Sequence, residues 1–151
     1  CSSTLRAVEF GILSGRTGLI ANVRAHHAAR SRPHLRTRLA GIPGFYRDTL
    51  GIALVHDGSA HGFCQFESGG LQVILEPIAS GAPDEEQALV GRFLGLSFAV
   101  KDLHAEHARL IARGVQFTGL PEAQAWGGML ATLQDPSGNR PQLVQYPAGG
   151  S

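Results

Sequence analysis

The chain has 151 residues, of which 43% are hydrophobic and 17% charged, a composition typical of one globular domain with a sizeable core. No run of about 18 apolar residues occurs, so the sequence pattern predicts no membrane-spanning helix. The two cysteines, Cys1 and Cys64, are too few for a disulfide framework and have no zinc-ligand spacing, so we expect a reduced, cytoplasmic protein. The Cys1 start leaves a processed lipoprotein as an alternative.

The net charge of +1 hides an asymmetry between the two parts of the chain. Residues 1–50 hold eight of the 13 basic residues and two of the 12 acidic ones, which gives +6 against −5 for residues 51–151. We interpret the Arg-rich part as a solvated surface, or as a partner for acidic groups of the second part. A nucleic-acid-binding patch and a targeting segment are the alternatives, and a partner nucleic acid is not expected because aromatic residues do not interleave with the arginines.

Strand and helix signals alternate along the first half of the chain. We predict a strand over 5–13, a helix over 18–32 that ends at Pro33, a short strand over 35–39 and a brief helix over 45–51. Three strand candidates follow in quick succession, at 52–57, 61–67 and 71–77. Residues 78–92 are polar and rich in turn formers, which is typical of a surface connection.

The second half repeats this order. After a strand over 93–100, a helix over 102–114 is predicted from the capping residue Asp102 and the terminating Gly114. Strands then follow at 115–119, 128–134 and 140–146, the last two joined by the turn-forming run Asp135–Asn139. Both halves therefore end in a helix and three strands, and an internal repeat of about 65 residues, each a βαβββ unit, is the simplest organisation.

Three motifs in this order resemble a known family: FYRDTLG, LSFAVKDLHAEHARLIARGV and DPSGNRPQLVQ. They are similar to the vicinal oxygen chelate superfamily, which includes glyoxalase I, bleomycin-resistance proteins, fosfomycin-resistance enzymes and extradiol dioxygenases. The resemblance covers residues 45–147. It implies an α+β fold in which two βαβββ modules curl into an incomplete barrel with a concave ligand cleft, and a homodimer. The expected boundaries are 1–80 and 93–151 for the modules and 81–92 for the linker.

Residues 1–44 depart from the family pattern, because no strand and bend of the usual kind precede Phe45. We consider two explanations for this atypical first module. Its first strand has moved upstream to 5–13 with an insertion behind it, or the module is degenerate and another subunit completes it.

The resemblance also implies where a divalent metal would bind, since family enzymes hold it with a His on a first strand and an acidic residue on a last strand. In the second module these positions fall near Gly95 and on Gln142, which supply no ligand and a neutral, poor ligand. In the first module the acidic position falls on Val73, with Glu76 on the opposite face. We therefore expect no metal and no cofactor, and the alternative is one divalent ion.

The predicted cleft is lined by alternating strand residues and closed by the loop over 122–128, which carries the single tryptophan. The expected ligand-binding residues are Val73, Leu75, Ser97, Trp126, Gln142 and Val144. We expect a metal-independent protein that binds a small molecule, and the resemblance implies antibiotic sequestration as one role, with a planar or cationic compound held in the groove. The alternative is a metal-dependent lyase, isomerase or dioxygenase that uses His34, His61 or Glu76. The sequence leaves open whether the protein is an enzyme.

Overall fold

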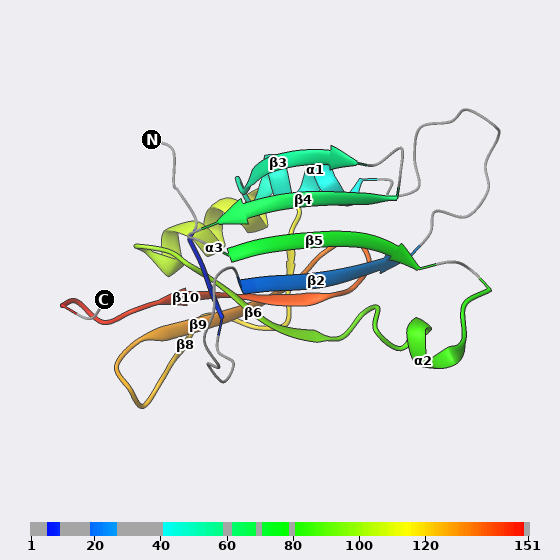
Figure 1. Cartoon of the computed structure of the whole chain (residues 1–151). Coiled ribbons are helices and arrows are strands. Elements are labelled where there is room, and N and C mark those ends of the chain that lie inside the picture. Colours follow the sequence, from blue (N-terminus) through cyan, green and yellow to red (C-terminus); the bar gives the residue numbers. More distant parts are fainter. Residues whose placement is uncertain are drawn as a thin grey trace.

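Two mixed sheets form the frame of the molecule. The computed structural model describes residues 6–9, 19–26, 41–58, 62–68, 71–78 and 81–149. The first sheet has the strand order β2-β5-β4-β3 (Figure 1) and contains Leu19–His26, Leu71–Ile78, Phe63–Ser68 and Ala53–Gly58. The second sheet has the order β1-β6-β10-β9-β7, with β8 also paired to β9. Its strands are Arg6–Glu9, Phe93–Ala99, Arg140–Gln145, Met129–Gln134, Gln116–Phe117 and Glu122–Ala123.

The two sheets share one topology. In each, the first strand of the unit lies parallel to the last: β2 pairs with β5, and β6 pairs with β10. Parallel neighbours need a long crossover connection, which carries the helical segment of the unit in both cases. The middle strands pair antiparallel, as consecutive strands joined by short turns do. This confirms the predicted α+β fold of two βαβββ units.

The helix predicted over 18–32 is wrong in its described part, because Leu19–His26 is strand β2. Every residue of β2 pairs with β5, from Leu19 opposite Leu71 to His26 opposite Ile78. Apolar residues at 19, 20 and 23 fit one side of a helix, but tertiary pairing outweighs this weak local preference. The first unit therefore has its own first strand, and neither a strand moved to 5–13 nor another subunit is needed to supply it.

Strand β1 lies inside the stretch predicted as a strand but joins the other unit. It pairs antiparallel with β6, with Arg6 opposite Ala99 and Glu9 opposite Leu96. The short strand predicted over 35–39, Cys1, His34 and His61 lie outside the described residues.

The helices differ in length and regularity. The first unit has a three-residue α1, Ile42–Gly44, continued by a π-helical turn η1, Phe45–Thr49. The connection between the units contains the four-residue α2, Asp84–Gln87, within the stretch predicted as a linker. The second unit has α3, Leu103–Ala112, whose N-terminus is capped as predicted: the Asp102 side chain accepts a hydrogen bond from the Ala105 N–H at 3.0 Å. No helix among these described elements is long and apolar enough to cross a membrane.

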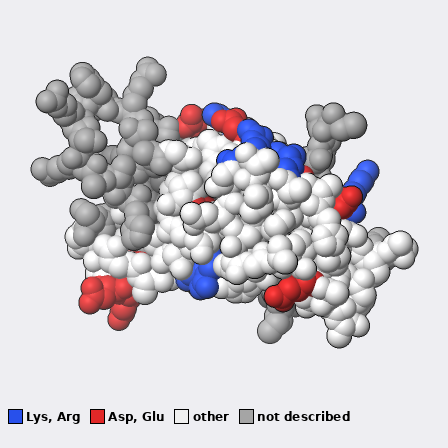
Figure 2. Space-filling model, turned by 180° about the vertical axis from the view of Figure 1, so that it is seen from behind, with Lys and Arg blue, Asp and Glu red and all other residues white. Residues whose placement is uncertain are grey.

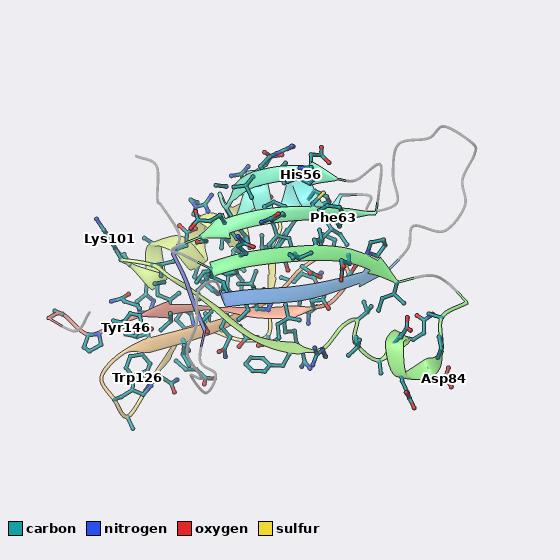
Figure 3. All side chains as sticks on the ribbon, in the orientation of Figure 1. His56, Phe63, Asp84, Lys101, Trp126 and Tyr146 are labelled. Atoms are coloured by element: carbon teal, nitrogen blue, oxygen red, sulfur yellow. The ribbon has the colours of Figure 1, made fainter. Side chains whose placement is uncertain are left out.

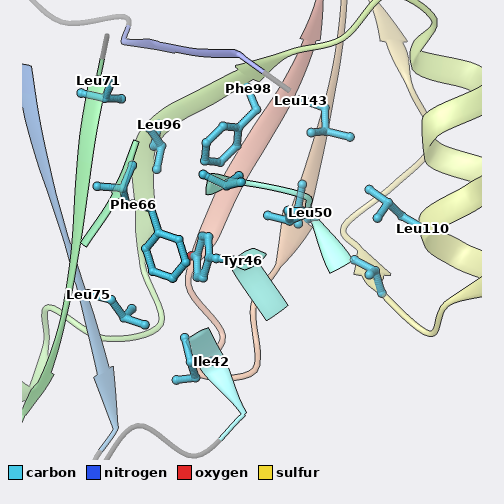
Figure 4. Packing of buried hydrophobic residues seen from close by; sticks show 14 of the residues in the cluster. Ile42, Tyr46, Leu50, Phe66, Leu71, Leu75, Leu96, Phe98, Leu110 and Leu143 are labelled. Carbon is cyan, nitrogen blue, oxygen red and sulfur yellow. The ribbon is translucent and has the colours of Figure 1, made fainter. Parts of the chain in front are cut away.

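One hydrophobic core joins both units (Figure 4). Tyr46 and Leu50 of the first helical segment are fully buried and pack with Phe66 of the first sheet and Phe98 of the second. Burial of large side chains of this kind stabilises by roughly 1.5–3 kcal/mol each. The helical segments thus cover one side of both sheets, and the opposite side of each sheet is left for other residues.

Two polar contacts reinforce this shared core. The Tyr46 hydroxyl donates to Asp135 Oδ2 at 2.8 Å, across 89 positions of the sequence. The Arg109 guanidinium of α3 donates to the Thr49 carbonyl at 3.1 Å and pairs with the buried Glu106 carboxylate. These contacts tie the turn and helix of the second unit to the helical segment of the first.

Candidate functional site

The strands of the second sheet separate their residues cleanly between two sides. Leu96, Phe98, Ala131, Leu133 and Leu143 belong to the core cluster beside α3. Strand neighbours point to opposite sides of a sheet, so Ser97, Thr132 and Gln142 lie on the side away from the helices. We call this side of the second sheet its inner face.

A row of polar residues crosses the inner face. Gln142 lies opposite Ser97 of β6 on one side and opposite Thr132 of β9 on the other. The Gln142 Nε2 donates to Thr132 Oγ1 at 3.1 Å, and Ser97 is 1% exposed. The row is therefore hydrogen-bonded and neutral. The expectation that Ser97 and Gln142 share a face is confirmed, whereas Thr132 was not predicted, although its place in the alternating run of β9 would have indicated it.

A bulge in β6 adjoins this row. Arg140 pairs with Phe93, but Gln142 pairs with Ser97, so β6 passes extra residues between two positions of β10. Gly95, at the centre of these extra residues, has φ of +67°, a conformation that favours glycine. A Cβ placed on Gly95 would meet no atom of the described residues within 4 Å. The expected His position of the family is thus an open space beside Gln142.

Arg140 is a second residue that the sequence reasoning missed. It lies two positions before Gln142 in β10, which places it on the same face of a regular strand. Its backbone N–H donates to the Arg92 carbonyl at 2.9 Å, and its Nε is buried without a hydrogen-bond partner. A two-residue period through Gln142 would have found this position, but not the state of its side chain.

Val73 and Leu75 are placed differently from the predicted cleft. Both are buried, at 1% and 0% exposure, and pack in the core with Phe66. We expected Val73 and Leu75 to lie in the cleft with Gln142, but the predicted register of β5 was wrong by one residue. A shift of one residue moves a strand side chain to the other side of the sheet. Gln72 and Ile74 alternate with them in β5, and Gln72 lies opposite Glu67 of β4. Gln72 therefore faces away from the helices, as does Gln65 of β4, which lies opposite Ile74.

Val144 and Trp126 lie farther along β10. Val144 shares the inner face with Gln142 but is fully buried. Trp126, which is 45% exposed, packs against Tyr146 with ring centroids 5.8 Å apart (Figure 3). The predicted closing loop is a tight hairpin end between β8 and β9, held by Gln124 N–H to Gly128 O at 2.8 Å. Trp126 and Tyr146 thus form an aromatic pair beyond the C-terminal end of β10, whereas Arg140 is the first residue of this strand.

The donor set at the expected metal positions does not fit a catalytic metal. Gly95 has no side chain, and the Gln142 amide nitrogen is already bonded to Thr132. Among the described residues, no three His, Cys, Asp or Glu side chains gather where they could hold an ion. His56 instead stacks on Phe63, with ring centroids 5.2 Å apart (Figure 3). Divalent ions of the family chemistry need three or four converging nitrogen or oxygen ligands, which these positions do not supply.

Cys64 is the one candidate nucleophile in the described part of the chain. It is fully buried in the first sheet, and its Sγ lies 3.7 Å from Asp57 Oδ1. A reactive thiolate requires an accessible, electropositive environment, so this cysteine packs as a small apolar residue.

A separate surface hollow of about 460 Å³ lies where η1, the end of α3 and the 135–138 turn meet. Asp135 contributes to its wall, but both carboxylate oxygens are engaged. Oδ1 accepts from the Ser137 and Asn139 N–H groups, and Oδ2 accepts from the Tyr46 hydroxyl and the Asn139 amide. Burial, followed by the charge of Asp135 and this hydrogen bond, raises the pKa of Tyr46 well above its usual value. The Asp135 carboxylate is therefore structural and is not free to meet a substrate, whereas the exposed Arg113 also lines the hollow.

Charged groups on the outer surface are interspersed. On the face seen in Figure 2, the described Lys and Arg side chains lie beside Asp and Glu side chains and form no continuous basic surface. Nucleic-acid binding depends on a continuous basic surface, and the described residues of this face do not form such a surface.

Comparisons with known proteins agree with the fold. The sequence profile of the Glyoxalase/Bleomycin resistance protein/Dioxygenase superfamily matches residues 37–143. A superfamily member from Sphaerobacter thermophilus is 25% identical with a TM-score of 0.59, and the match covers 88% of this chain and 98% of that one.

Two further solved structures have the same fold. TnmS3, an antibiotic binding protein from Streptomyces, is 22% identical with a TM-score of 0.59, over 90% of this chain and 99% of that one. A lactoylglutathione lyase from Agrobacterium tumefaciens is 16% identical with a TM-score of 0.59, over 92% and 98%. No curated protein matches the sequence. The profile match spans most of the chain and includes the helix, hairpin and inner-face residues described above, and the chain therefore belongs to the glyoxalase/bleomycin resistance protein/dioxygenase superfamily.

Proposed function

We propose that the protein binds a small organic molecule at the inner face of the second sheet without a metal ion and without chemical conversion. The observation that carries this proposal is the pair of positions where family enzymes are expected to hold their metal. One is Gly95, with open space beside it, and the other is Gln142, whose amide is bonded to Thr132. Open space next to neutral hydrogen-bonding groups favours recognition of a ligand over activation of one.

Other features support a binding role. Trp126 and Tyr146 form a partly exposed aromatic pair at the far end of the same strand, and such pairs contribute large contact areas to ligands. Among the solved structures with this fold, TnmS3 is described as an antibiotic binding protein. We therefore extend the proposal to sequestration of a drug-like compound. The homodimer and the cytoplasmic location stay predictions from the sequence.

Metal dependence can be tested on chelator-treated, tag-free protein. We expect no rise of the melting temperature when Ni²⁺, Zn²⁺, Mn²⁺ or Fe²⁺ is added, because the inner face supplies no set of ligands. A matched variant, Gly95→His with Gln142→Glu, restores the residue types of the family enzymes. A melting temperature that rises and saturates at one ion per wild-type chain would contradict the metal-free proposal.

Ligand binding can be read from the single tryptophan. A panel of planar aromatic compounds should contain members that change Trp126 fluorescence saturably and raise the melting temperature in parallel. Gln142→Ala should remove both effects, whereas Gln72→Ala should leave them in place. Turnover of a hit by the wild-type protein would favour the enzymatic alternative instead.

A further inference from the structure

The Arg140 side chain has an unusual lack of partners. The ion pairs Arg47–Asp48 and Arg109–Glu106 do not involve Arg140. The acidic residue nearest in sequence, Asp135, already accepts hydrogen bonds at both oxygens. The Arg140 Nε nevertheless has no accessible surface and no acceptor.

A buried guanidinium donor in this state is costly. Buried polar groups are nearly always hydrogen-bonded, and those that are not call for an unseen water, ion or ligand. An unsatisfied charged donor costs more than a neutral one, so an acceptor outside the described protein groups is expected to meet it. A guanidinium remains charged at any physiological pH and matches planar oxyanions in geometry.

The surroundings of Arg140 complete an acceptor-binding site. Gln142, two positions along the strand and so about 6.6 Å away, uses one of its two amide hydrogens on Thr132 and keeps the second. Gly95 leaves open space in the facing bulge. Strands β6, β9 and β10 contain no Asp or Glu, and the exposed Glu122 of β8 lies opposite Leu130, farther along the sheet from Arg140 than Thr132 is.

From this arrangement we infer that the ligand of the inner face carries an anionic oxygen, a carboxylate or a similar planar oxyanion, and that the Arg140 side chain turns toward the space at Gly95 so that its enclosed Nε donates to this oxygen. The inference rests on the proposed binding function and names the chemical class of its ligand. It replaces the earlier expectation of a cationic compound, because an uncompensated guanidinium repels a cation. The aromatic pair at Trp126 and Tyr146 adds a preference for a ring at the other end of an elongated ligand.

The test follows the Arg140 Nε–H signal in the ¹H–¹⁵N spectrum of the labelled full chain, assigned by its disappearance in Arg140→Lys. The probes are 2-naphthoate, the neutral 2-naphthamide of the same shape, and acetate. We expect both anions to move this signal saturably and the amide to leave it in place. Arg140→Gln should weaken 2-naphthoate binding about tenfold or more, the effect of one charge-assisted hydrogen bond.

Arg92→Gln is the matched control. It removes an exposed positive charge beside the β6–β10 pair and leaves the Arg140 side chain unchanged. It should change 2-naphthoate affinity by less than about twofold, since exposed charges are screened. An Nε–H signal that ignores both anions, or equal losses in the two variants, would overturn the inference and assign the buried nitrogen to water. Equal, Gln142-dependent binding of naphthoate and naphthamide would overturn it as well while supporting the proposed function. Acetate binding at Arg140 without saturable binding of either naphthalene compound would support the anion site and count against the organic ligand.

Discussion

The two sheets have the same strand order, yet the sides that face away from the helices carry different chemistry. In the first sheet, β4 and β5 contain Glu67 and Glu76 in addition to Gln72. In the second sheet, the central strands β6, β10 and β9 have no acidic residue, Glu122 lies at the edge in β8, and Arg140 stands next to the neutral row of Gln142 and Thr132. The comparison teaches that the repeat maintains the core pattern of the fold and leaves one face free to diverge.

The largest effect is expected where the two units are tied together. Asp135→Ala leaves the Tyr46 hydroxyl, the Asn139 amide and two backbone N–H groups without their acceptor. Each buried unsatisfied donor costs roughly 1–3 kcal/mol, so we expect a loss of about 3–5 kcal/mol in the free energy of unfolding, measured by urea denaturation. Asp48→Ala, whose carboxylate is exposed and paired with Arg47, should leave it nearly unchanged, because exposed ion pairs contribute little. A loss below about 1 kcal/mol for Asp135→Ala would show that the tie is dispensable.

A smaller effect is expected at the hairpin end that distinguishes the second sheet. A Cβ on Gly128 would collide with the Trp126 ring and approach the Gln145 carbonyl oxygen at 2.5 Å. Gly128→Ala should therefore displace the ring and cost about 1–3 kcal/mol, together with a shift of the Trp126 emission maximum. Gly119→Ala has no atom within 4 Å of the new methyl group and serves as the control. Unchanged emission in Gly128→Ala would mean that the ring does not rest on this glycine.

The two glutamines provide the direct functional comparison of the sheets. Gln142→Ala should weaken binding of a fluorescence-detected ligand about tenfold, because the amide next to the open space at Gly95 is lost. Gln72→Ala changes a glutamine of β5 in the first sheet, and it should alter the dissociation constant by less than about twofold. If the two variants lose affinity equally, the site extends over both sheets.

The fold was largely predictable because its signals are local. The helix over 103–112 follows from the Asp102 cap and from Gly114, which has the positive φ of 84° that such a terminating glycine adopts. Strand β2 was missed because its identity depends on pairing with β5, which lies about fifty residues later. A preference set by distant partners leaves little trace in an eight-residue window.

The site was less predictable because it depends on register and on side-chain surroundings. Ser97 and Gln142 were placed correctly from the alternation of the strands, whereas Val73 and Leu75 were shifted by one position into the core. The unpaired state of Arg140 has no sequence signature, since it arises from the acceptors that are missing around Nε.

The smallest expected effect is the pH dependence of the hydrogen bond from Tyr46 to Asp135, which joins the two units. Because the pKa of Tyr46 is raised, the folded phenol stays protonated above pH 10, where the unfolded phenol, with its ordinary pKa of 10.0, ionises. The contribution of Tyr46 is therefore complete below about pH 10 and is lost as the pH rises further. Tyr46→Phe should cost about 1 kcal/mol at pH 7, and the difference from the wild type should narrow at pH 10.5, measured by urea denaturation at both values. A constant difference would contradict the raised pKa.

The pairing of β1 with β6 has a consequence for folding during synthesis on the ribosome. Arg6–Glu9 leaves the ribosome about ninety residues before its partners at 96–99. At about 5–20 residues per second, the early strand waits several seconds or more with its backbone donors and acceptors free. Long-range pairing of this kind also slows the final step of folding, because the chain loses the entropy of a large loop before the strand pair stabilises the fold. Completion of the second sheet is thus a late event in synthesis, and until β6 has been made the unpaired β1 is the segment that can pair with a neighbouring nascent chain.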